Sequence, residues 1–80
     1  RWREVFADVL MVGFWRLEYP KDAEPLIDDL LDYRNKNKTN GFSHYSNCWT
    51  SIARKADLPN KPAELIAWSD NIRNTADCKL

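Results

Sequence analysis

The feature that most constrains this chain is an apolar run near its N-terminus, where Asp8 is the only polar residue between Val5 and Trp15. A run this apolar and continuous is expected to be buried against other parts of the fold. One set of its apolar residues recurs at the spacing of a single helical face: Trp2, Val5, Phe6, Val9, Leu10, Gly13 and Leu17.

Further apolar residues widen that stripe almost all the way round the helix, which indicates a segment contacted on more than one side. We therefore predict a central α-helix over residues 2–19. The alternative is a strand built on residues 9–12, but no second alternating run of β-branched residues is available to pair with it. Gly13 costs about 1 kcal/mol in a helix interior relative to Ala, so we expect another helix to approach closely there.

The apolar run does not suit a membrane or a targeting role. A bilayer-spanning helix needs about 20 apolar residues, and this run is shorter and flanked by charge. It also lacks the leading basic segment and small-residue cleavage site of a signal peptide.

The length of 80 residues predicts one domain, spanning residues 1–80. A domain this small buries only about 60% of its unfolded surface, so its stability is marginal. Four tryptophans, three tyrosines and three phenylalanines supply large apolar area per residue, and self-association would supply more.

Three further helices follow from apolar periodicity and from start and stop signals, over residues 22–35, 46–56 and 60–74, with an irregular loop at residues 36–45. Asp22 and Asn60 are expected to cap two of them. We expect Ile52 and Ile66 to lie on the apolar sides of the last two helices. The predicted fold is an all-α, small four-helix domain.

Residues 49–72 are similar to a helix-turn-helix template, and the spacing of Trp49 and Trp68 resembles the last two helices of a Myb/SANT repeat. Asp57 stands where such templates usually have Gly. The resemblance covers about a third of the chain and implies two crossed helices, and we do not take it as family membership.

Charge is unevenly distributed along a chain whose net charge is zero. Residues 1–33 hold four basic and eight acidic residues, and residues 34–80 hold the reverse. The two halves either complement each other within one fold or leave a basic surface able to meet a phosphate backbone. The candidate nucleic-acid contacts are Lys36, Lys38, Arg54, Lys55, Lys61 and Arg73.

The acidic residues of the second predicted helix, Asp28, Asp29 and Asp32, lie on the side away from its apolar face. We expect this acidic side to be solvated, and the alternative is a docking surface for a basic partner.

The sequence contains few residues in patterns that would support catalysis or metal binding. Cys48 and Cys78 are the only cysteines, and neither belongs to a metal-ligand spacing. A disulfide between them is possible, while a reduced, cytoplasmic setting is the default expectation. His44 and Cys48 are the one nearby Cys/His pair, without a third orienting group, and Asp8 is the one carboxylate with an apolar setting. We expect a non-enzymatic protein without cofactor or metal.

Two functional hypotheses follow. The first is a protein–protein interaction module, including self-association, with exposed aromatics on the second face of the first helix at Met11, Trp15 and Tyr19. The second is nucleic-acid binding through the basic C-terminal half.

Overall fold

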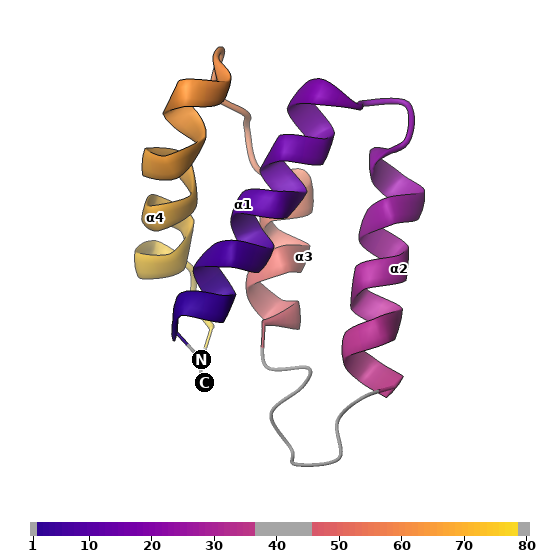
Figure 1. The fold of residues 1–80 in the computed structure, drawn as a ribbon. Coiled ribbons are helices and arrows are strands. Elements are labelled where there is room, and N and C mark those ends of the chain that lie inside the picture. Colours follow the sequence, from indigo (N-terminus) through magenta and orange to yellow (C-terminus); the bar gives the residue numbers. More distant parts are fainter. Residues whose placement is uncertain (1, 37–45, 79–80) are drawn as a thin grey trace.

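The computed structural model describes residues 2–36 and 46–78, and these residues form helices and no strand. The helices are α1 (Trp2–Glu18), α2 (Ala23–Lys36), α3 (Asn47–Lys55) and α4 (Leu65–Thr75), with a 3₁₀ turn η1 (Pro62–Glu64) leading into α4. They run alternately up and down, so that the start of α1 and the end of α4 lie at the same end of the domain (Figure 1). The predicted all-α, four-helix fold is confirmed.

Helix α1 is the centre of the domain, because it contacts α2, α3 and α4, whereas α2 and α4 do not contact each other. In Figure 1, α1 lies in front of α3, with α4 and α2 on opposite sides of this pair. Val5, Val9 and Val12 of α1 are fully buried. The other buried apolar residues come from all three neighbouring helices: Ala23, Ile27, Trp49, Ala53, Leu65 and Ile72.

The start of the fourth helix differs from the prediction that Asn60 caps it. Lys61 is the N-cap of the 3₁₀ turn η1, with extended backbone at φ −134° and ψ 146°, and Glu64 is the N-cap of α4. A residue that precedes proline is driven out of the helical region by the proline ring, so Lys61 cannot be helical and the first turn begins at Pro62.

Two isoleucines expected on apolar helix faces are instead open to solvent: Ile52 is 38% exposed and Ile66 is 64% exposed. Trp49 and Ala53 fill the α3 side of the core, and Leu65 and Ile72 fill the α4 side. The helices α3 and α4 run in opposite directions (Figure 1), and the crossed, helix-turn-helix-like arrangement is not confirmed.

Gly13 is a point of close approach between α1 and α4, and the sequence predicted that another helix would approach there. A Cβ atom added at Gly13 would overlap the Trp68 ring and lie 2.9 Å from Leu65 Cδ2. The Trp68 indole is held in place because its Nε1–H donates to the Asp57 carbonyl at 2.7 Å.

A disulfide joins Cys48, near the start of α3, to Cys78, which follows α4. The two cysteines are 30 residues apart in sequence, so the bridge closes a loop containing all of α4. In the chain-entropy model a loop of this size stabilises the fold by about 3.5 kcal/mol. The sequence did not decide whether this disulfide forms, and it is present in the structure.

We predict that Gly13→Ala lowers the free energy of unfolding by about 1–3 kcal/mol, because overpacking against Trp68 and Leu65 outweighs the better helix propensity of Ala. Urea denaturation followed by circular dichroism measures this change. In a Trp68→Leu background the cost of Gly13→Ala should shrink, since the overlapping ring is gone. An equal cost of Gly13→Ala in both backgrounds would show that the Trp68 ring is not the source of the steric overlap.

We also predict that reducing the Cys48–Cys78 bridge lowers the free energy of unfolding by about 2–4 kcal/mol. Guanidinium denaturation with and without dithiothreitol measures the loss. The Cys48→Ser/Cys78→Ser double variant is the matched control, because its denaturation curve should not respond to the reductant. Identical curves for the oxidised and reduced wild-type chain would contradict the prediction.

Candidate functional site

An apolar groove of about 470 Å³ lies between α1 and the start of the fourth helix. Its α1 wall follows the i, i+3, i+4, i+7 spacing of one helical face, and its other wall comes from η1 and α4. The lining residues are Ala7, Leu10, Met11, Phe14, Pro62 and Leu65.

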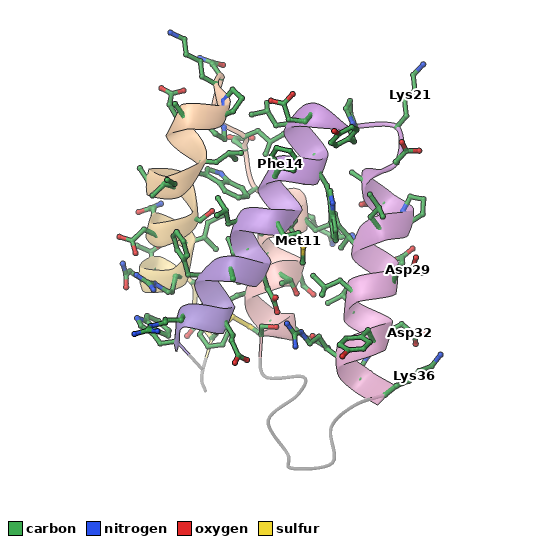
Figure 2. The ribbon with its side chains drawn as sticks, viewed as in Figure 1. Met11, Phe14, Lys21, Asp29, Asp32 and Lys36 are labelled. Carbon is green, nitrogen blue, oxygen red and sulfur yellow. A yellow bond between two sulfur atoms is a disulfide. The ribbon has the colours of Figure 1, made fainter. Side chains whose placement is uncertain are left out.

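The groove lies on the side of α1 opposite the core. At 100° per residue, Ala7, Leu10, Met11 and Phe14 point roughly opposite to Val5, Val9 and Val12. Figure 2 shows Met11 and Phe14 on α1, away from the charged side chains labelled along α2. Phe14 is 43% exposed, so a large apolar ring stays in contact with solvent at the rim.

The second wall of the groove is positioned by the close packing at Gly13. Leu65 is buried against α1 at this point, and Pro62 precedes it by three residues at the first position of η1. Because Pro62 has no N–H and Leu65 faces inward, this wall offers apolar surface with little hydrogen-bonding capacity. The groove can therefore bind apolar side chains but offers few polar groups for catalysis.

The three predicted interface residues occupy different environments. Met11 lines the groove. Trp15 is half-buried and packs against the hydrophobic core. Tyr19 is 52% exposed, and its ring meets the edge of Phe14 with centroids 5.8 Å apart. Of the three predicted residues, the groove itself contains Met11 alone.

The other groove residues were not predicted as interface residues, although the sequence carries a signal for them. Ala7, Leu10, Met11 and Phe14 form an apolar stripe bounded by Arg3 before it and Glu18 after it. The stripe is hidden in the sequence because the opposite side of the same helix is equally apolar.

Three of the six predicted basic contact residues are paired with carboxylates in the part of the chain that the structure describes. Lys36 bonds Asp32 at 2.9 Å, and Arg73 pairs with Asp70. The Arg73 guanidinium also lies 5.1 Å from the ring centroids of both Trp2 and Phe6. These contacts leave less positive charge free to meet phosphate.

Arg54 is engaged by α2 in the same way. It bonds the Asp28 carboxylate at 2.5 Å and the Glu24 carboxylate at 3.1 Å, and the hydrogen bond to Asp28 is the largest cause that raises the pKa of Arg54. Lys55 and Lys61 are exposed, and Lys38 lies outside the described residues. The acidic side of α2 thus serves in part as an internal partner for α3.

Asp8 is buried within the fold, being only 3% exposed, and it forms a polar cluster that joins three segments. Arg34 of α2 donates from Nε to Oδ2 at 3.1 Å and from Nη2 to Oδ1 at 2.9 Å. Ser46, which precedes α3, donates from Oγ to Oδ2 at 2.6 Å. A carboxylate held by a bidentate Arg and a hydroxyl is positioned for structure, since its oxygens are already occupied.

The candidate Cys/His pair does not supply a nucleophile. The Cys48 sulfur is bonded to Cys78, and His44 lies outside the described residues. Within residues 2–36 and 46–78, no group of three His, Cys, Asp or Glu side chains is arranged to hold a metal ion.

Comparison with protein-family models, curated proteins and solved structures finds no match to this chain. Among the described helices, none has both the length and the apolar character required to cross a membrane.

We predict that Asp8→Ala lowers the free energy of unfolding by about 3 kcal/mol, because it removes the carboxylate to which the partly buried Arg34 donates two hydrogen bonds. Arg34→Met should cost a similar amount by leaving Asp8 buried with Ser46 alone. The double variant should cost clearly less than the sum, which urea denaturation of all four proteins measures as a double-mutant cycle. Additive costs would show that the two side chains are not coupled.

Proposed function

We propose that this protein is a non-enzymatic helical binding module that acts through protein–protein contact at the groove between α1 and α4. The observation that carries the proposal is an apolar i, i+3, i+4, i+7 stripe of α1 that lines an open groove and is only partly covered by η1 and α4. Grooves with such spacing suit an amphipathic helix, whose own apolar face lies along them.

The composition of the groove supports contact over turnover. Met adapts its shape to different partners, and an exposed Phe supplies large contact area. Leu10 and Met11 are half-buried, so the floor of the groove is already packed and needs little ordering when a partner binds.

The Cys48–Cys78 bridge bears on where the protein works. Disulfides form and persist in oxidising compartments and are rare where glutathione and thioredoxin keep thiols reduced. The sequence favoured a cytoplasmic setting by default. We propose instead an oxidising compartment, in which the bridge supplements a small core.

We expect peptides selected from a displayed library of amphipathic helices to bind the chain with dissociation constants below about 100 µM. Fluorescence anisotropy measures the affinity. Leu10→Glu should weaken binding at least tenfold, because it places a charge in the apolar floor. Asn71→Glu, on the exposed side of α4, is the matched control and should leave the affinity unchanged.

The same anisotropy assay separates this function from nucleic-acid binding. With nonspecific DNA and RNA at about 50 mM salt, we expect no binding. Two results together would favour the nucleic-acid alternative over the proposal. The first is nucleic-acid binding that weakens steeply with salt, and the second is equal peptide affinity for the Leu10→Glu variant and the wild-type chain.

A further inference from the structure

We propose that the occupant of the groove is a second copy of this chain, with the two α1 helices packed antiparallel around a two-fold axis between Leu10 and Met11. This inference rests on the proposed function, that the groove is a contact surface, and it names the partner. Its basis is the order of side chains along the open stripe of α1.

The apolar side chains of the stripe complement themselves in size when the helix is reversed. In an antiparallel pair centred between Leu10 and Met11, Leu10 of one copy faces Met11 of the other, and Ala7 faces Phe14. The exposed Phe14 ring therefore meets the smallest residue of the groove. Alternation of large and small residues across facing positions is what fills a helix–helix interface without voids.

The charges at the ends of the stripe follow the same symmetry. Arg3 and Glu18 are equally far from the axis, so Arg3 of each copy faces Glu18 of the other copy in the antiparallel pair. At 100° per residue, both fall with the four groove residues of α1 within an arc of about 100°. One face of α1 thus carries a positive end, an apolar centre and a negative end.

Within one copy these two charges cannot meet. They are separated by 15 residues, which is about 22 Å along a helix. Both are exposed, and neither forms an ion pair with another residue of the described segments. In the antiparallel pair, Arg3 of one copy meets Glu18 of the other, which gives one pair of opposite charges at each end of the interface.

This pattern favours a second copy over a partner of one charge. A uniformly acidic or basic helix would match one end of the stripe and be repelled by the other. The net charge of the chain is zero, so two copies do not repel each other as whole molecules. The contact surface is small, so we expect a weak dimer with a dissociation constant of about 50 µM.

Sedimentation equilibrium of the full, disulfide-bonded chain from about 5 to 500 µM measures the dimer directly, since this range spans the expected constant. Arg3→Glu and Glu18→Arg should each weaken dimerisation about tenfold, because each replaces two attractive pairs by two repulsive ones. The charge-swapped chain R3E/E18R restores both pairs and should return to within about threefold of the wild type.

Two charges outside the groove provide matched controls. Lys21, in the turn before α2, and Asp29, on α2, are exposed and lie away from Met11 and Phe14 (Figure 2). Lys21→Glu and Asp29→Arg change charge by the same amount as the test variants and should leave dimerisation unchanged. Far-UV circular dichroism checks that all variants fold, which their exposed positions favour.

A chain that stays monomeric at 500 µM overturns the second-copy inference. If that monomer still binds selected helical peptides in a manner lost with Leu10→Glu, the proposed function stands without it. A dimer that does not respond to the single charge reversals, or is not rescued by the double swap, also overturns the inference, because its interface lies on another surface.

Discussion

The packing of α1 against its three neighbours is the interaction on which the rest of the domain depends. Val5, Val9 and Val12 are completely buried on one side of this helix, and each contributes roughly 1.5–3 kcal/mol by leaving water. The helices α2 and α4 do not contact each other, so the core is continuous only because α1 and α3 lie between them. Without α1, only the contacts of α3 would connect α2 to α4.

Polar contacts then fix how each neighbour is placed on α1. Asp8 reaches Arg34 of α2 and Ser46 before α3, so one buried carboxylate positions two segments. Arg16 donates from Nη1 to the carbonyls of Ala53 and Ala56 at 2.6 and 2.7 Å, which satisfies part-buried acceptors at the C-terminal end of α3. The disulfide ties the other end of α3 to the segment after α4.

The sequence predicted the elements well because their signals are local. The apolar run, the proline positions and the turn residues are enough for four helices with ends within a few residues of the observed ones. Gly13 also had a local signal, because a glycine inside a helix is costly unless a neighbour needs the space.

The partners across the fold could not be predicted in this way. Asp8 lies 26 residues from Arg34, and Cys48 lies 30 residues from Cys78, so each pairing depends on how the helices are arranged. Ile52 and Ile66 look like core residues by periodicity, but the neighbouring helices do not reach them. The basic residues looked free because their carboxylate partners, such as Asp28 for Arg54, lie on another helix.

The groove follows from the same cause. A helix that is apolar on all sides needs neighbours on all sides, and α1 has three in an 80-residue chain. The sequence shows that apolar surface exceeds the neighbours available, but only the arrangement of α2, α3 and α4 decides which stripe stays open. That stripe is the one at Ala7, Leu10, Met11 and Phe14, between opposite charges at Arg3 and Glu18. An exposed apolar helix face lowers the solubility of a small domain unless a partner covers it. Apolar patches of this kind therefore mark interaction surfaces.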